Sequence, residues 1–134
     1  MKAQKLRNGE VAMVLQFGGT RFVQLNRDGR TEKRTFPVNL YTSGGRIDVL
    51  PNGNVILPEN ANNRLVEIEP VGANNGRVVW EIAFDQPVAA TRLANGHTII
   101  TSMSPSRGAV EIDRSGKEVW TYKTDTRVTR ALRR

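Results

Sequence analysis

Few side chains of this sequence can transfer a proton or form a covalent bond near neutral pH. There is one histidine, His97, and no cysteine, which excludes disulfides, thiolate metal sites, cysteine nucleophiles and sites built from several histidines. His97 directly follows an Asn-Gly pair, and residues beside such turns are usually at the surface. We therefore expect a surface residue rather than a general base or a sulfate acceptor, and the sequence assigns no catalytic residue and no metal ligand.

Carboxylate and amide side chains recur in pairs separated by one apolar residue: Gln24/Asn26, Glu67/Glu69 and Glu111/Asp113. In an extended strand both members of a pair point to one face, opposite the apolar residues. Paired carboxylates can serve acid–base or metal chemistry, but a pair that returns in every repeat is typical of a structural feature. We expect these acids to pair with basic side chains on the adjacent strand, such as Arg77 and Lys117.

Four further polar residues are candidates for binding a ligand in a channel: Arg46, Asp48, Thr91 and Arg92. The two arginines could hold an anion, because a guanidinium group offers paired N–H donors to oxyanions. The alternative is that they pair with Asp48 and Asp85 or remain solvated. No glycine-rich phosphate loop followed by a helix accompanies them.

The net charge of +7 at pH 7, from 20 Lys and Arg against 13 Asp and Glu, raises the question of polyanion binding. The basic residues gather in residues 1–46 and 127–134, and the basic runs there, KAQKLR, RDGRTEKR and RVTRALRR, contain no interleaved aromatic side chains that could stack on bases. We expect a solvated charged surface rather than a nucleic-acid partner. No stretch approaches the ~20 apolar residues of a membrane span, and no secretory leader is evident, so no membrane partner is expected and the compartment stays open.

The elements that carry these residues repeat along the chain. Asn-Gly pairs begin at Asn8, Asn52 and Asn95, and each has a leucine two residues before its asparagine and a run rich in β-branched residues after it. The period of about 43 residues and the turns between the runs predict four short antiparallel strands per unit. Asn-Gly between two such runs predicts a two-residue type I′ turn, and no segment shows the spacing of a helix.

Four strands in about 40–45 residues are typical of a β-propeller blade. The units are expected at about residues 2–38, 46–84 and 89–123, within a single repeat domain that covers residues 1–134. Residues 128–134 resemble the first strand of a further unit.

Trp80 and Trp120 each lie four residues after a glycine, Gly76 or Gly116, and so occupy the same place in the second and third units. We expect each indole to cover the gap between neighbouring blades and to donate its N–H to a backbone carbonyl. In the first unit the same spacing gives Lys33. The structural signature of the blade is therefore Trp80, Trp120, Gly53, Gly96 and Gly116.

The segments LPNGNVIL, RLVEIE, GRVVWEI and AVEIDRSGKEVWTYK resemble the blades of quinoprotein-like β-propellers, in particular the arylsulfotransferase-like and pyrroloquinoline-quinone-repeat groups. The resemblance covers nearly the whole chain and implies a propeller fold. It also implies that catalytic members use histidines, or a quinone with a divalent cation, near the central channel. In this chain His97 stands where the blade pattern has asparagine, and no cofactor is assigned.

Three blades are too few to close a ring, because propellers have about four to eight, and an open half-ring would expose adhesive sheet faces. We therefore expect an all-β fold with about three four-stranded blades per chain, half of a six-bladed ring closed by homodimerisation. The expected function is a non-enzymatic scaffold or binding module with an anion or small ligand in the channel. Its expected partners are a second copy, a small anion or a protein. The alternative is a fragment of a larger arylsulfotransferase-like or quinone-dependent propeller enzyme.

Overall fold

The fold consists of β-strands joined by short turns. The computed structural model describes residues 3–40, 46–104, 107–123 and 131, so nearly all of the strand expected at 128–134 lies outside the described residues. Within these ranges the chain forms twelve strands and one 3₁₀ turn, η1 (Asn60–Asn62). The same ranges contain no helix that is long and apolar enough to cross a membrane.

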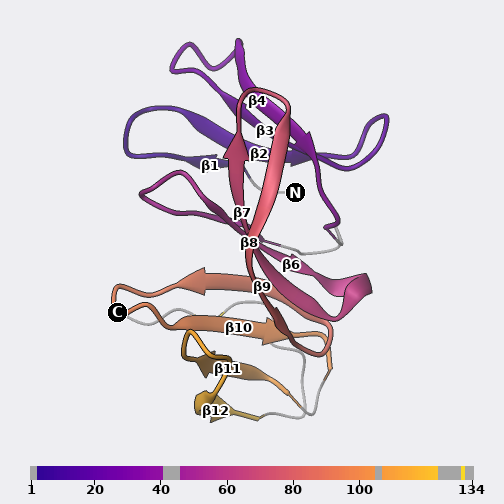
Figure 1. Ribbon diagram of the computed structural model, residues 1–134, viewed down its shortest axis with the longest axis vertical. Helices are drawn as coiled ribbons and strands as arrows, with labels where there is room; N and C mark the ends of the chain where they lie inside the picture. Colours follow the sequence, from indigo (N-terminus) through magenta and orange to yellow (C-terminus); the bar gives the residue numbers. More distant parts are fainter. Residues whose placement is uncertain (1–2, 41–45, 105–106, 124–130, 132–134) are drawn as a thin grey trace.

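The strands form three four-stranded antiparallel sheets, each built from four consecutive strands. Blade 1 contains β1 (Gln4–Lys5), β2 (Val11–Leu15), β3 (Arg21–Leu25) and β4 (Glu32–Pro37). Blade 2 contains β5 (Asp48–Val49), β6 (Val55–Glu59), β7 (Arg64–Val71) and β8 (Asn75–Ala83). Blade 3 contains β9 (Pro87–Arg92), β10 (Thr98–Ser102), β11 (Ala109–Ile112) and β12 (Glu118–Tyr122). The blades follow one another in chain order along the long axis (Figure 1), which confirms the expectation of an all-β fold with three four-stranded sheets.

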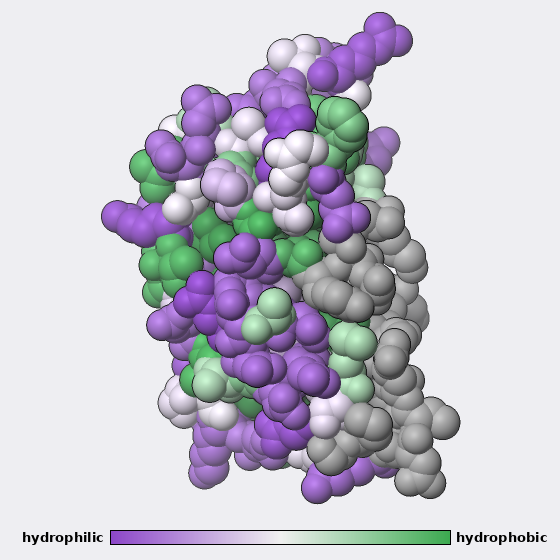
Figure 2. Space-filling view, turned by 90° about the vertical axis from the view of Figure 1, so that its right-hand side faces the viewer, coloured by the Kyte–Doolittle hydropathy of each residue, from purple (hydrophilic) through white to green (hydrophobic). Residues whose placement is uncertain are grey.

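Two apolar clusters hold the blades together. The cluster between blades 1 and 2 contains Ala12, Val14, Phe22, Phe36, Val38, Leu40, Ile47, Val55, Leu57, Val66 and Ile68. The cluster between blades 2 and 3 contains Ile56, Leu65, Phe84, Ala90, Ile100, Val110 and Ile112. Figure 2 shows that, on one side of the molecule, hydrophobic residues reach the surface in patches between hydrophilic ones. Burial of these clusters, at ~25 cal/mol per Å² of apolar surface, is the main force that fixes one blade on the next.

The middle blade is covered on both faces. In β6, Val55 and Leu57 belong to the cluster shared with blade 1, whereas Ile56 between them belongs to the cluster shared with blade 3. All three side chains are fully buried. Successive residues of a strand point to opposite faces, so a strand buried on both faces has a continuous apolar run, as Val55–Leu57 does.

The three Asn-Gly turns share one geometry, which differs from the type I′ turn that we expected. In each turn the leucine carbonyl accepts the glycine N–H. Of the Asn-Gly pair only the glycine has a positive φ, between 86° and 89°. The asparagine Oδ1 accepts the N–H of the residue two positions later, at 2.9–3.0 Å. The loop is therefore a three-residue turn that ends in a glycine bulge. Because the asparagine side chain stabilises its own turn, one residue with positive φ suffices, and Gly53 and Gly96 provide it.

The register of the outer strands corrects one residue assignment. In each blade one residue of the fourth strand lies opposite the same position of the third strand. These pairs are Arg34 opposite Gln24, Trp80 opposite Glu67 and Trp120 opposite Glu111. Lys33, which the spacing from a glycine indicated, falls in a bulge instead. The turn of blade 1 is one residue longer, because Asn26 N–H bonds to the Thr31 carbonyl whereas Asp113 N–H bonds to the Lys117 carbonyl.

Candidate functional site

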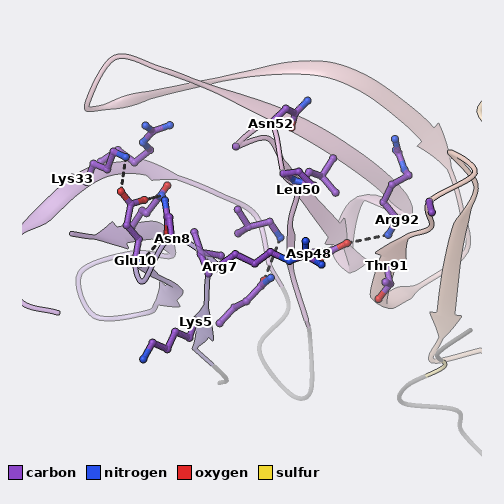
Figure 3. Close-up of a pocket in the computed structure, with 18 of the residues that line it drawn as sticks. Lys5, Arg7, Asn8, Glu10, Lys33, Asp48, Leu50, Asn52, Thr91 and Arg92 are labelled. Atoms are coloured by element: carbon purple, nitrogen blue, oxygen red, sulfur yellow. Dashed lines mark hydrogen bonds and ion pairs between the residues drawn. The ribbon is translucent and has the colours of Figure 1, made fainter. Parts of the chain in front are cut away.

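The inner strands of the three blades surround a cavity with a volume of about 1040 Å³. Its walls come from β1, β5 and β9 and from the leucine turns that follow them, and β4 contributes Lys33 and Arg34. Figure 3 shows polar side chains from these segments around a common space, with Glu10 joined to Lys33 and Asp48 joined to Arg92. The inner strands of a propeller face its central channel, so this cavity is the candidate site.

Three of the four expected channel residues line the cavity, namely Asp48, Thr91 and Arg92. Arg46 is not among the lining residues, and its backbone N–H bonds to the Val88 carbonyl at 3.0 Å. Burial raises the pKa of Asp48, and the N–H of Arg92 and the charges of Arg46 and Arg92 oppose this effect only in part. The structure thus brings three candidates together and leaves Arg46 beside them.

The guanidinium group of Arg92 interacts with other side chains of the same chain. The group donates to Glu67 Oε2 at 3.2 Å and to Thr98 Oγ1 at 3.0 Å, and it lies 5.0 Å from the centre of the Trp80 ring. The side chain is only 12 % exposed. The expected carboxylate partners were Asp48 and Asp85, but the carboxylate beside the guanidinium group is Glu67, and Asp48 accepts the backbone N–H of Arg92.

Glu67 is the centre of the contact between blades 2 and 3. It is buried, and it accepts hydrogen bonds from Asn54 of its own blade at 3.0 Å and from Arg114 of blade 3 at 3.2 Å. Trp80 contacts the guanidinium groups of Arg92 and Arg114, and its Nε1–H donates to the Arg114 carbonyl at 3.0 Å. Burial acts to raise the pKa of Glu67, but the hydrogen bonds and the two positive charges outweigh burial and hold that pKa below its usual value.

The residue after each Asn-Gly turn pairs with the acid or amide of the third strand in its own blade. The pairs are Glu10 with Gln24, Asn54 with Glu67 and His97 with Glu111. All three third-strand residues are buried, whereas we expected them on a face opposite the apolar residues with partners on the outer strand. Their partners lie on the second strand instead, because these third-strand side chains are buried and a buried polar group must find a hydrogen bond inside the protein.

The outer members of the acid pairs have the expected partners only in part. Glu69 Oε1 lies 2.8 Å from Arg77 Nη2, as expected. Asp113 Oδ1 accepts the hydroxyl and N–H of Ser115 and the backbone N–H of Lys117, not the lysine ammonium group. These hydrogen bonds, that of the Ser115 side chain first, lower the pKa of Asp113.

His97 is the one imidazole in this series of pairs. Its Nδ1 lies 2.8 Å from Glu111 Oε1, and the imidazole is 30 % exposed whereas the carboxylate is 2 % exposed. A carboxylate that accepts the Nδ1–H orients the ring and leaves Nε2 as a proton acceptor. The expectation of a surface residue beside the turn missed this pairing. The signal that could have found it is the polar residue that follows the Asn-Gly pair in all three repeats.

Cationic side chains outnumber acidic ones around the cavity. The charged lining residues are Lys5, Arg7, Lys33, Arg34 and Arg92 against Glu10 and Asp48. Lys33 Nζ lies 2.7 Å from Glu10 Oε1 and is the main cause of the lowered pKa of Glu10. Arg34 Nε is buried without a hydrogen-bond partner in the part of the chain that the structure describes. An excess of positive charge in the lining attracts anionic groups. The described residues contain no cluster of three or more His, Asp or Glu that could hold a metal ion.

The comparisons with known proteins concern the fold. No protein-family model and no curated protein match the chain. A protein of unknown function from Bacteroides caccae matches 92% of this chain and 45% of its own, with a TM-score of 0.68 and 18% identity. A streptogramin B lyase matches 92% of this chain over 40% of its own length, with a TM-score of 0.63 and 16% identity. Virginiamycin B lyase from Staphylococcus aureus matches 94% of this chain over 41% of its own length, with a TM-score of 0.61 and 19% identity.

The chain has a propeller-like fold. It spans less than half of the length of each of these structures. Membership of the quinoprotein-like or arylsulfotransferase-like groups is not confirmed, because no family model matches. The expectation of a non-enzymatic module is contradicted, since two of the three structures are lyases, and they agree better with the alternative of a piece of a larger propeller enzyme.

Proposed function

We propose that this chain supplies three consecutive blades of a larger propeller enzyme, in which the inner cavity receives the substrate and His97 transfers a proton. The observation that carries the proposal is the pairing of His97 Nδ1 with the buried carboxylate of Glu111 at 2.8 Å. Blades 1 and 2 form the same structural pair without an imidazole. Histidine in blade 3 therefore adds a chemical ability that the fold does not require.

Elimination is the reaction class that we propose. Two structures with this fold are lyases by name, and breaking a bond by elimination requires a base that removes a proton from the substrate. Nε2 of His97 takes that proton from a substrate carbon, and the electron pair of the broken C–H bond forms the new double bond as the leaving group departs with its own pair. The imidazolium that forms is stabilised by Glu111, as a carboxylate does for histidine in hydrolases.

The cavity favours a substrate that carries an anionic group. The turn that leads to His97 contributes Leu93 and Ala94 to the lining, whereas His97 itself is not among the lining residues. In the proposed reaction the substrate extends from the cavity past this turn to the imidazole. Lys5 and Arg7 are exposed at the wall that blade 1 provides. An excess of positive charge raises the local concentration of anions and orients a carboxylate or phosphate through charge-assisted hydrogen bonds.

The variant that tests this function is His97→Asn. Asparagine occupies the equivalent position in blade 2, where Asn54 bonds to Glu67 at 3.0 Å, so the substitution preserves the turn and removes the base. With streptogramin B as the first substrate, chosen from the name of a structure with this fold, we expect conversion by the wild-type protein, measured by mass spectrometry. We expect His97→Asn to be slower by about 10²–10⁴-fold at an unchanged melting temperature.

Glu69→Gln is the matched control. This acid is exposed, pairs with Arg77 and is not among the residues that line the cavity, so its loss should leave the rate unchanged. Equal rates for wild type and His97→Asn would remove His97 from the reaction. No conversion by the wild-type protein would contradict elimination on this substrate.

A further inference from the structure

Two acidic side chains line the cavity, and their surroundings differ. Glu10 lies 2.7 Å from Lys33 Nζ and accepts a further hydrogen bond from Gln24. Asp48 forms none of the ion pairs within the ranges that the structure describes, and its one hydrogen bond there joins Oδ2 to the backbone N–H of Arg92 at 3.0 Å. Asp48 is half-buried, and a carboxylate that loses hydration without gaining a cation is destabilised. The described residues therefore do not compensate the charge of Asp48 by direct contact.

Arg92 contacts Asp48 through its backbone, but its side chain pairs elsewhere. The guanidinium group donates to Glu67 Oε2 at 3.2 Å and to Thr98 Oγ1 at 3.0 Å. The charges of Arg46 and Arg92 offset the effect of burial only in part, so the pKa of Asp48 stays above its ordinary value. A cationic group of a ligand that contacts Asp48 would supply the missing compensation, and perturbed carboxyl groups in a cavity are typical of binding sites.

The fold requires a hydrogen-bond acceptor at this position but no acid. The register places Gln4, Asp48 and Thr91 at equivalent positions of the innermost strands β1, β5 and β9. Gln4 Oε1 of blade 1 accepts the N–H of Val49 of blade 2 at 3.2 Å, just as Asp48 Oδ2 of blade 2 accepts the N–H of Arg92 of blade 3. A neutral amide thus makes the same contact between neighbouring blades. The negative charge of Asp48 is additional to this structural role.

The second oxygen of the Asp48 carboxylate is available to a ligand. Oδ2 accepts the backbone N–H of Arg92, whereas Oδ1 makes none of the hydrogen bonds in the part of the chain that the structure describes. Oδ1 is also not among the buried side-chain atoms of the described residues that lack a partner, so solvent reaches this oxygen. Because Asp48 lines the cavity, a ligand inside it can contact Oδ1 without disturbing the bond to Arg92.

Cationic side chains come from other segments of the cavity wall. Lys5 and Arg7 belong to β1 and to the turn that follows it, and Arg34 belongs to β4. These three residues make none of the ion pairs within the described ranges. In Figure 3, Asp48 lies apart from Lys33 of blade 1. The cavity therefore offers positive charge from blade 1 and negative charge from blade 2.

We propose that the cavity binds a zwitterionic ligand, whose ammonium group donates to Asp48 Oδ1 and whose anionic group lies against Lys5, Arg7 and Arg34. The inference names the substrate class of the proposed function, and it rests on that function in taking the cavity as the substrate site. An ammonium group on a half-buried carboxylate gains a charge-assisted hydrogen bond, whereas an uncharged group of the same size gains none. Among anions of similar size, those with an ammonium group therefore bind more tightly.

Matched pairs of small sulfonates test the ammonium site. Taurine has nearly the size of propanesulfonate, and homotaurine that of butanesulfonate, but an ammonium group replaces the terminal methyl group. Isothermal titration calorimetry with the wild-type protein should show at least about tenfold tighter binding of the zwitterion in one or both pairs. Asp48→Asn keeps an oxygen for the Arg92 N–H, as Gln4 does for Val49, and should reduce this preference to less than about twofold.

Two further variants complete the test. Asp85→Asn makes the same change at an exposed acid that is not among the lining residues, and it should keep the preference. Asp48→Gln introduces the residue of blade 1 and replaces Asp48→Asn if that variant does not fold. Equal binding within both pairs, no binding of any of the four compounds, a preference that persists without Asp48, or its loss in Asp85→Asn would overturn the proposal. Every readout is a dissociation constant, so none of these outcomes bears on the His97→Asn rate.

Discussion

The same position of the third strand holds an amide or an acid in each blade, and its surroundings decide what it does. Gln24 bonds to Glu10 within blade 1, whereas Glu67 bonds to Asn54 and to two arginines of blade 3. A buried carboxylate stays ionised only where donors and cations compensate for its lost hydration. Glu67 therefore joins two blades as well as two strands.

Replacement of Glu67 should make the protein less stable and less sensitive to acid. The pKa of Glu67 in the folded protein lies below its ordinary value of 4.5, so the ionised carboxylate stabilises the fold above pH 4.5, and this stabilisation is lost as the pH falls through the lowered value. Glu67→Gln should lower the free energy of unfolding at pH 7 by about 2 kcal/mol, because Arg92 loses its anion in a mostly buried place. Urea unfolding at a series of pH values should show the difference from wild type shrinking below pH 4.5.

Glu81→Gln is the control for this measurement. Glu81 is exposed and pairs with Arg64 at 2.6 Å, and exposed ion pairs contribute about 0–1 kcal/mol. A difference between Glu67→Gln and wild type that stays constant down to about pH 3 would show that the Glu67 charge does not stabilise the fold.

At the scale of the element, two glycines with the same backbone angle serve different purposes. Gly53 and Gly116 both have φ 89°, which is strained for any residue with a Cβ. No atom lies within 4 Å of the Cβ position at Gly53, whereas Ile82 Cδ1 lies 2.3 Å from that position at Gly116. The first glycine shapes a turn, and the second also allows blade 2 to approach blade 3.

Alanine at the two glycines should separate these effects. Gly53→Ala should cost about 1 kcal/mol of unfolding free energy, from backbone strain alone. Gly116→Ala should cost about 3 kcal/mol, because overlap with Ile82 adds to the strain. In Ile82→Ala the overlapping atoms are gone, so adding Gly116→Ala to that variant should cost about 1 kcal/mol again. Denaturant unfolding of the four variants measures this coupling, and additive losses would show that the close approach carries no energy.

At the scale of the whole molecule, the sequence predicted what is local and missed what depends on packing between blades. The strands and their order follow from the turns at Asn8, Asn52 and Asn95 and from the alternation of apolar and polar residues within each repeat of about 40 residues. The turn type was wrong because the Asn side chain bonds within its own loop. The partners of Glu67 lie 25 and 47 residues away in the next blade, and no spacing rule within one repeat could locate them.

The cavity belongs to this largest scale, because all three blades contribute to its lining. Its excess of cationic side chains predicts that a multivalent anion stabilises the fold by binding there. Millimolar sulfate should raise the melting temperature by about 3–5 °C, corresponding to ~1 kcal/mol, above the effect of sodium chloride at equal ionic strength. Differential scanning fluorimetry measures the shift.

Arg34 is the cation whose loss should abolish that shift. Its Nε is buried without a hydrogen-bond partner in the described ranges, on the lining that β4 contributes. Arg34→Met keeps much of the apolar stem and removes the charge, so the sulfate effect should fall to the level of sodium chloride. Arg77→Gln removes an arginine of the same sign that pairs with Glu69 and is not among the lining residues, and it should leave the shift unchanged. If both variants lose the shift equally, sulfate acts on the overall charge of the protein, and the cavity is not an anion site.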